Sequence, residues 1–200
     1  MKKEKISIIS LKRELGRLKR LVYHDSLTGL YNRKGFAEDA LGYLKELKSE
    51  QARNRREFKI NNFSVIFIDL NDFKKLNDKH GHPCGDKTIV AFAAFLKKSV
   101  RSFDIVCRWS GDEFVVGLVG AGLKEAAKIA GKIKNLVAVK NWRLCGKNLK
   151  LSVSLGVASA IDRERKPQSI FKLESLIEEA DRKMYQDKKR EKSLFKLNLF

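Results

Sequence analysis

The chain has 200 residues, of which 43% are hydrophobic, and a formal net charge of +19 at pH 7. That length supports one domain with a hydrophobic core and excludes two domains of ordinary size, so we expect a single domain behind a short leader. The positive charge favours an anionic partner, and nucleic acid, a membrane surface and nucleotide phosphates all qualify.

Cysteine and hydropathy patterns exclude further classes. Cys84, Cys107 and Cys145 are odd in number and have no C-x-x-C spacing, which argues against a disulfide framework and against a zinc site. We therefore expect three reduced thiols in a cytoplasmic protein. The apolar stretch 6–11 is far shorter than the ~20 residues that span a bilayer, so neither a membrane segment nor a signal peptide is predicted.

Residues 4–23 are predicted to form an amphipathic helix. Apolar side chains recur there at spacings of three and four, between lysines and arginines. The stripe would either pair with a helix of a partner or cover the core of its own domain, and the pattern does not distinguish the two. Its residues are Ile8, Leu11, Leu15, Leu18 and Val22.

The next segments contain a turn, a helix, a loop and a strand. Residues 24–30 interrupt the helical pattern, a second helix is predicted over 33–50, and the polar stretch 51–59 indicates a loop. Residues 63–68 are β-branched and aromatic, as in a buried strand. Asp69 stands at the end of that strand.

Two helices follow this strand. The first is predicted over about 72–79 and is closed by Gly81. The second is predicted over about 85–99, and its apolar residues lie on one face. Those residues are Ile89, Phe92, Ala93 and Leu96.

A hairpin is predicted in the middle of the chain. Its strands cover 105–109 and 114–119, and a tight turn at Ser110 and Gly111 joins them. A helix over 123–139 and an alternating strand over 149–158 come next. One face of a final helix carries Leu173, Leu176, Ile177, Ala180 and Met184. The order is mixed α/β, with helices between strands and one antiparallel hairpin.

Three carboxylates mark the candidate site. Asp69 ends one strand, and Asp112 and Glu113 begin another, so the three acids converge if those strands are neighbours. Oxygen ligands of this kind suit Mg²⁺, which is usually completed by substrate phosphates. A divalent cation that carries a nucleoside triphosphate would balance the acids. Lys74, about one helical turn beyond the strand, could reach the same phosphates.

Six segments together resemble, in order, the motifs of GGDEF-domain diguanylate cyclases, with SGDEF in place of GGDEF. The resemblance covers roughly residues 24–190, and it divides the chain into a leader helix (1–23), a catalytic domain (24–190) and a tail (191–200). The segments are DSLTGLYNR (25–33), FIDLNDFKKLND (67–78), GHPCGD (81–86), RSFDIVCRWSGDEF (101–114), SVSLGVA (152–158) and EADRKMYQDK (179–188).

The resemblance implies a palm-like fold related to nucleotide cyclases, with a central, mostly antiparallel sheet flanked by helices. It implies that two GTP condense to cyclic di-GMP with release of two pyrophosphates, in a homodimer whose two domains face each other. The metal is Mg²⁺ or Mn²⁺. By position, Asp69, the backbone carbonyl of Leu70 and Asp112 are the implied metal ligands. Glu113 would support the second metal or the 3′-hydroxyl, and Asp112 is our first choice for promoting deprotonation of that hydroxyl.

The same resemblance implies how GTP is recognised. Asn77 and Asp86 match the pair that reads guanine, with His82 nearby. A carboxylate at Asp86 can accept from guanine N1–H and the 2-amino group, donors that adenine lacks. Lys74 and Lys188 fall at phosphate-binding positions; without the resemblance, Lys188 would be interpreted as surface solvation.

Three positions depart from the family pattern. Ser110 replaces the first glycine of the signature and precedes Gly111 where the backbone passes close to the guanosine; it would cost about 1 kcal/mol if its φ is positive. Asn71 stands where a second aspartate is common. Glu191 and Lys192 replace the usual Gly-Arg pair, which weakens the expected phosphate contact at Lys188.

A feedback site is also implied. Arg101 and Asp104 form an R-x-x-D motif before the signature, where many diguanylate cyclases bind cyclic di-GMP as an inhibitor, and Lys132 falls where the family often supplies a second basic contact. The alternative is an ordinary ion pair between Arg101 and Asp104 at a helix end.

Two other functions remain open at this stage. One is a degenerate domain that binds GTP or cyclic di-GMP without turnover, for which Ser110 is the main support. The other is a nucleic-acid-binding module, which the charge favours but no recognised motif supports, so no nucleic acid is expected. The family commonly carries an upstream sensor, and a sensor is therefore a possible further partner.

Overall fold

The structure, a computed structural model, describes residues 7–48, 62–161 and 172–197. Parts of three predicted segments therefore lie outside the described residues. They are residues 1–6 of the leader, residues 49–50 of the second predicted helix, and the whole loop predicted over 51–59. Within the described ranges, no helix is long and apolar enough to cross a membrane.

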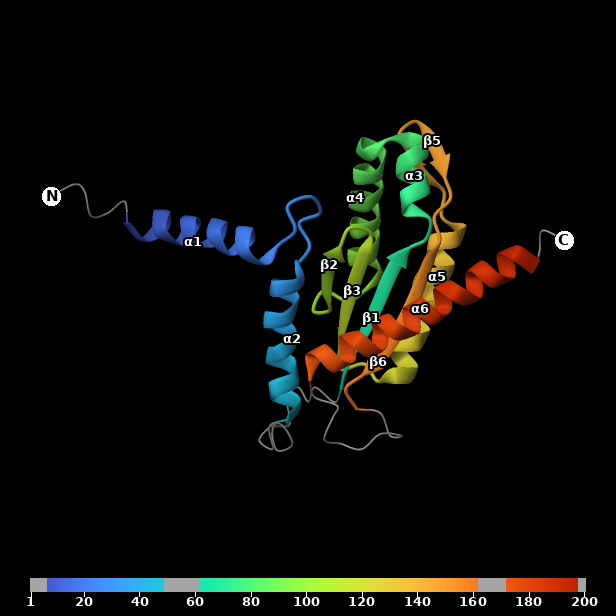
Figure 1. The fold of residues 1–200 in the computed structure, drawn as a ribbon. Coiled ribbons are helices and arrows are strands. Elements are labelled where there is room, and N and C mark those ends of the chain that lie inside the picture. Colours follow the sequence, from blue (N-terminus) through green and yellow to red (C-terminus); the bar gives the residue numbers. More distant parts are fainter. Residues whose placement is uncertain (1–6, 49–61, 162–171, 198–200) are drawn as a thin grey trace.

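Helices and strands are interspersed along the chain, in the mixed α/β order that the sequence predicts (Figure 1). The helices are α1 (Ser7–Tyr23), α2 (Arg33–Lys48), α3 (Phe73–His80), α4 (His82–Ser99), α5 (Leu123–Val139) and α6 (Leu173–Leu197). The strands are β1 (Phe63–Leu70), β2 (Ile105–Ser110), β3 (Glu113–Val119), β4 (Trp142–Leu144), β5 (Lys147–Leu149) and β6 (Val153–Ser159).

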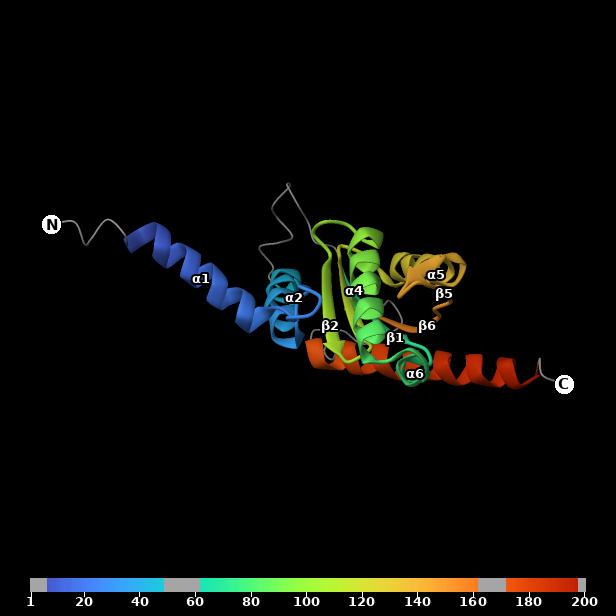
Figure 2. The ribbon, with the colours of Figure 1, turned by 90° about the horizontal axis from the view of Figure 1, so that it is seen from above.

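The central sheet has the strand order β2-β3-β1-β6, and each neighbouring pair is antiparallel. The predicted antiparallel sheet is therefore confirmed. β1 lies between β3 and β6, and all eight of its residues are buried. Helices cover both faces of the sheet, which explains why β1 has a nearly continuous apolar sequence (Figures 1 and 2).

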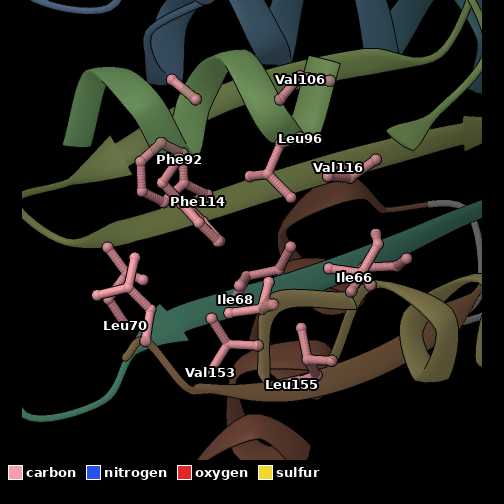
Figure 3. Packing of buried hydrophobic residues seen from close by; sticks show 14 of the residues in the cluster. Ile66, Ile68, Leu70, Phe92, Leu96, Val106, Phe114, Val116, Val153 and Leu155 are labelled. Atoms are coloured by element: carbon pink, nitrogen blue, oxygen red, sulfur yellow. The ribbon is translucent and has the colours of Figure 1, made fainter. Parts of the chain in front are cut away.

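Each face of the sheet has its own core. Ile66, Ile68 and Leu70 of β1 point to the face that α4 and α5 cover, where Phe92 and Leu96 pack against them (Figure 3). The alternate residues of β1 point to the opposite face, which α2 and α6 cover. The large side chains of this second core include Phe36, Val65, Phe67, Leu176 and Met184.

Some element boundaries differ from the prediction. α4 begins at His82, three residues earlier than expected, because Gly81 (φ 81°) breaks the chain direction and Pro83 favours the first turn of a helix. The hairpin turn falls at Gly111 and Asp112, so β2 extends to Ser110. The strand predicted over 149–158 is two segments, since β5 ends at Leu149 and β6 begins at Val153.

The short hairpin of β4 and β5 was not predicted from the sequence. Its two turn residues, Cys145 (φ 55°) and Gly146 (φ 71°), both have positive φ, as a tight two-residue hairpin turn requires. Trp142 anchors β4 in the first core, with its indole N–H donating to Val137 O at 3.1 Å.

The prediction of three reduced thiols is wrong for two of them. Cys84 and Cys145 are disulfide-bonded, with 5.9 Å between their Cα atoms and 61 positions between them in the sequence. The fold places the hairpin turn against the first turn of α4, and spacing along the sequence cannot reveal such a contact. Cys107 is free and buried, and its burial raises the pKa of its thiol.

Helix α1 extends away from the rest of the molecule and contacts α2 at its C-terminal end (Figures 1 and 2). Its apolar stripe remains exposed, from 66% at Ile8 to 41% at Val22. The alternative in which this stripe covers the core of its own domain is therefore wrong.

Candidate active site

The sheet brings the three predicted carboxylates to one edge. In the register of β1 and β3, Asp69 lies directly opposite Glu113. Asp112 occupies the turn that precedes β3, and its backbone carbonyl accepts from the Leu70 N–H at 3.2 Å. The three acids meet at this edge because β1 ends here, before α3, and the antiparallel β3 begins here, after the hairpin turn.

Asp69 is the most deeply buried of the three, with 6% of its surface exposed. Lys188 of α6 reaches it, and Lys188 Nζ lies 2.6 Å from Asp69 Oδ1. A buried carboxylate needs such a partner, since an unpaired charge in the interior is costly. Lys188 therefore belongs to the site rather than to the solvated surface.

Among the described residues, neither of the other two acids has a comparable partner. Burial, followed by the negative charge of Asp69, raises the pKa of Asp112, which Lys188 and Arg108 offset in part. The pKa of Glu113 is raised in the same way by burial and then by Asp69, Asp112 and Asp181. This edge of the sheet thus holds more negative charge than its neighbours neutralise.

A pocket of about 590 Å³ opens beside these acids, between the β1–α3 connection and α6. Lys74, Lys75 and Lys188 line it, together with the acidic residues Asp72, Asp112 and Glu191. The first turn of α3 also faces this pocket, so the partial positive charge of its unpaired backbone N–H groups adds to that of the lysines. The pocket is therefore lined by equal numbers of lysines and acids, a mixture that suits phosphates bound together with a cation.

Asn71 and Glu191, two of the departures from the family pattern, meet in the structure. Asn71 Nδ2 donates to Glu191 Oε2 at 2.5 Å, and Ser154 Oγ donates to Asn71 Oδ1 at 2.8 Å. Glu191 also pairs with Lys134 of α5 at 2.7 Å. Sequence analysis missed this network, which connects α5, α6 and the connection after β1.

The donor set fits a hard cation that arrives with phosphates. Among the described residues, no group of three or more His, Cys, Asp or Glu side chains is arranged to hold a metal ion alone. Mg²⁺ commonly takes only one or two carboxylates and completes its shell with water and substrate phosphates. Asp69 and Asp112 can supply those carboxylates, and the Lys188 ammonium on Asp69 already shows a cation at this position.

The predicted guanine-binding residues gather where α3 meets α4. Asn77 Oδ1 is buried and has no hydrogen-bond partner in the part of the chain that the structure describes, a costly state that a donor from a ligand would relieve. A side chain at Gly85 would collide with Asn77 Oδ1, so glycine is needed there for the close approach of the two helices. His82 and Asp86 are exposed on the first turns of α4.

Ser110 is accommodated without backbone strain. Among the described non-glycine residues, only Asp72 and Cys145 have positive φ, and Gly111 (φ 36°) alone takes that conformation in the signature turn. The cost that was expected for Ser110 therefore does not arise. Arg108 supports the turn, since its Nε donates to Gly111 O at 3.0 Å while its guanidinium pairs with Asp25 at 3.2 Å.

The residues of the R-x-x-D motif do not pair through their side chains. Arg101 pairs with Glu125 at 3.0 Å. Asp104 is buried and accepts from the backbone N–H groups of Arg101 (2.9 Å) and Val119 (3.1 Å), so its carboxylate holds the loop before β2. Lys132 lies exposed on α5. The alternative of a simple side-chain ion pair between Arg101 and Asp104 is wrong.

Residues 22–193 match the family model described as "Diguanylate cyclase, GGDEF domain". The chain is 36% identical over 174 residues to diguanylate cyclase DgcS of Shewanella oneidensis, covering 87% of this chain and 52% of that protein. It is 33% identical over 170 residues to the response regulator PleD of Caulobacter vibrioides, covering 84% and 34%. The chain thus spans about a third to a half of the length of these curated relatives.

Solved structures share the fold. The coiled coil and GGDEF domain of DgcB from Caulobacter crescentus, in complex with c-di-GMP, superposes with a TM-score of 0.76 at 23% identity, covering 92% of this chain and 90% of that one. A sensory box/GGDEF family protein from Caulobacter crescentus gives a TM-score of 0.70 at 30% identity, covering 84% and 99%. The first match, at its low identity, supports the fold alone.

Proposed function

The chain belongs to the GGDEF family of diguanylate cyclases, and from this premise we propose that it condenses two GTP into one cyclic di-GMP with release of two pyrophosphates. The observation that carries the proposal is the edge of the sheet where Asp69 lies opposite Glu113, with Asp112 in the adjoining turn and a lysine-lined pocket beside them. The relative named diguanylate cyclase DgcS supports the same activity.

Metal binding is part of this proposal. Asp69, the backbone carbonyl of Leu70 and Asp112 would hold Mg²⁺ or Mn²⁺, and Glu113 would support a second ion or the 3′-hydroxyl. When bound, the metal neutralises phosphate charge and orients the α-phosphate. Lys74 and Lys188 line the pocket and would bind the β- and γ-phosphates.

The residues of the chain then have distinct roles in the reaction. The 3′-oxygen of one GTP attacks the α-phosphorus of the other, the bond to pyrophosphate breaks, and the 3′-hydroxyl loses its proton. Asp112 is our first choice for promoting the loss of that proton, because it would lie beside the reacting hydroxyl. The same exchange in the opposite direction closes the ring.

Guanine selection would come from the junction of α3 and α4. Asp86 would accept from guanine N1–H and the 2-amino group, His82 lies close by in sequence, and the unpartnered Asn77 Oδ1 would gain a donor. Adenine offers neither of these two donors at the same edge, so ATP should be a poor substrate. GTP is a cytoplasmic nucleotide, and we accordingly place the activity in the cytoplasm.

Catalysis requires two chains, because each domain holds one GTP. The exposed stripe of α1 supports a homodimer in which two leader helices pair, and an upstream sensor could control that pairing.

Product inhibition is a further element of the proposal: cyclic di-GMP would bind Arg101 and Lys132. Asp104 would join them only if it released the backbone N–H groups that it now accepts. Binding of cyclic di-GMP that disappears in Arg101→Ala would support this site.

A degenerate domain that only binds nucleotides is less well supported than an active one. Its main support was strain at Ser110, and the backbone there is not strained. The acids that turnover needs are all present at the sheet edge.

Incubation of the protein with GTP and Mg²⁺, followed by chromatographic separation of the nucleotides, tests the proposal. Asp69→Asn and Asp112→Asn should each lower the rate of cyclic di-GMP formation at least about 100-fold, since each removes charge that acts on the reacting phosphates. Glu178→Gln, the same chemical change at an exposed position of α6, is the matched control and should retain the rate. Wild-type rates in either aspartate variant would contradict the assignment.

A further inference from the structure

The bond between Cys84 and Cys145 connects the first turn of α4 to the tip of the β4–β5 hairpin. The two Cα atoms lie 5.9 Å apart, within the usual range for a disulfide. Among the described residues no other covalent bond joins segments distant in the sequence. The hairpin is therefore tied to α4 by a link that redox chemistry can make or break.

The two cysteine residues differ in how deeply they are buried. Cys84 is buried, with 3% of its surface exposed, whereas Cys145 is only partly buried at the hairpin turn. A small thiol or disulfide can therefore reach Cys145 first. Cys107 is fully buried, and burial raises the pKa of its thiol, so it cannot supply the thiolate that exchange requires.

The bond lies beside the residues that we assign to guanine binding. Cys84 immediately precedes Gly85, whose lack of a side chain makes room for Asn77 Oδ1, and Asp86 comes next. The same turn is joined to α3 through the hydrogen bond from Gly81 N to Asn77 O at 2.7 Å. Any change in how the first turn of α4 is held will alter the spacing between Asn77 and Asp86.

The proposed use of GTP in the cytoplasm favours a reversible disulfide between Cys84 and Cys145. GTP is used in the cytoplasm, where thiol reductants keep most cysteines reduced and where disulfides are usually transient or redox-sensing. A partly exposed bond is also easier to reduce than a fully buried one.

We propose that Cys84 and Cys145 form a reversible thiol–disulfide exchange site for small disulfides such as glutathione disulfide, and that the oxidised form holds Asn77 and Asp86 in the geometry that binds guanine. This inference rests on the proposed function, because it concerns the affinity of those residues for GTP.

The chemistry balances without a further reactant. The Cys145 thiolate attacks one sulfur of glutathione disulfide, which forms a mixed disulfide and releases one glutathione thiolate. The Cys84 thiolate then attacks the Cys145 sulfur, which forms the protein disulfide and releases the second glutathione. Two protein thiols are oxidised, one glutathione disulfide is reduced, and the two thiol protons pass to the released glutathione molecules.

The test equilibrates the protein in buffers of increasing glutathione disulfide to glutathione ratio. Thiols are counted by alkylation after denaturation, and the KM for GTP and hydrogen exchange at the amides of residues 84–86 are measured in parallel. The alkylated count should fall from three thiols to one, since only Cys107 remains free. On reduction, the KM should rise about fivefold or more, the ordinary range for coupling between two sites, and the amides should exchange faster.

Two variants complete the experiment. Cys145→Ser removes the accessible partner and should show the KM and exchange of the reduced protein in every buffer, whereas Cys107→Ala should respond as the wild type does. An unchanged KM and unchanged exchange while the thiol count falls would overturn the proposal, as would a count that stays at three under oxidising conditions. If no cyclic di-GMP forms in any buffer, the proposed function fails, and the thiol count and hydrogen exchange still report on the exchange site.

Discussion

At the scale of single residues, the acids at the sheet edge lie where burial and neighbouring negative charges disfavour their ionised forms. Burial and mutual repulsion raise the pKa values of Asp112 and Glu113, and Lys188 pairs with Asp69 rather than with them. A site that only served stability would not keep unneutralised charge here. This excess is consistent with a cation that binds together with the substrate.

The raised pKa of Asp112 predicts a stabilising substitution. Between its ordinary pKa of 3.8 and its raised value, the folded chain binds more protons than the unfolded chain, so stability falls as pH rises through that window and stays lowered above it. Asp112→Asn should therefore raise the melting temperature of the metal-free protein at pH 7, by about 2–4 °C for each 1 kcal/mol of repulsion removed.

Measurement of both melting temperatures at different pH values provides the control for this prediction. The difference between Asp112→Asn and the wild type should shrink as the pH is lowered toward 3.8, where the wild-type carboxyl becomes neutral as well. Thermal unfolding at a series of pH values measures it. A lower melting temperature for Asp112→Asn at pH 7 would show that the Asp112 carboxylate is stabilising, contrary to this account.

Gly85 is predicted to control nucleotide affinity. An alanine there would push against Asn77 Oδ1 and displace the side chain that we assign to guanine. Gly85→Ala should raise the KM for GTP about tenfold, the usual consequence of losing a hydrogen bond to a buried group. Steady-state kinetics measures this change. Gly131→Ala, where a new methyl group meets nothing within 4 Å, is the control and should leave the KM unchanged.

Individual residues were predictable to the extent that their role follows from motif position. The register confirms that Asp69 and Glu113 meet at one edge. The partner of Asp69 and the network of Asn71 with Glu191 could not be predicted, since both depend on how α6, about 120 positions away, crosses the sheet. At Ser110 the position in the motif suggests backbone strain, but the structure shows no positive φ there.

At the scale of elements, length and periodicity decided what the sequence could predict. α5 has the predicted bounds, and the apolar face of α6 is buried as expected because a long repeat at helical spacing leaves little ambiguity. β4 and β5 have three residues each, too few for an alternating pattern to be recognised. The disulfide escaped prediction for the same reason, since one of its cysteines lies in this unpredicted turn.

Packing of α6 on β6 gives a prediction about stability. A side chain at Gly156 would overlap the backbone of α6 at Ala180 and Met184. Gly156→Ala should therefore lower the free energy of unfolding by about 1–3 kcal/mol, as overpacking of a core usually does. The exposed helical change Gly131→Ala should instead raise it by up to about 1 kcal/mol, because alanine is the better helix former. Denaturant unfolding of both variants would test the pair, and equal effects would contradict the assigned contact.

At the scale of the whole molecule, the exposed face of α1 and the need for two nucleotides both favour a reaction carried out by two paired chains. We predict that activity per chain rises with protein concentration. Leu15→Glu should shift the half-maximal concentration upward about tenfold or more, since a charge replaces an exposed leucine that pairing would bury in both chains. Lys19→Glu, an exposed change on the same helix, should shift it less. Activity per chain that is independent of concentration in the wild type would remove the two-chain mechanism.

The central claim is that the acidic edge of the sheet converts GTP to cyclic di-GMP. The most direct test uses the protein at a concentration that favours pairing of two chains and incubates it with GTP and Mg²⁺. The GTP consumed, the cyclic di-GMP formed and the pyrophosphate released are measured in one sample. We expect a ratio of two to one to two, no cyclic product from ATP under the same conditions, and formation of cyclic di-GMP at least about 100-fold slower in the Asp112→Asn variant. GTP that is bound but recovered unchanged, or pyrophosphate released without a cyclic dinucleotide, would contradict it.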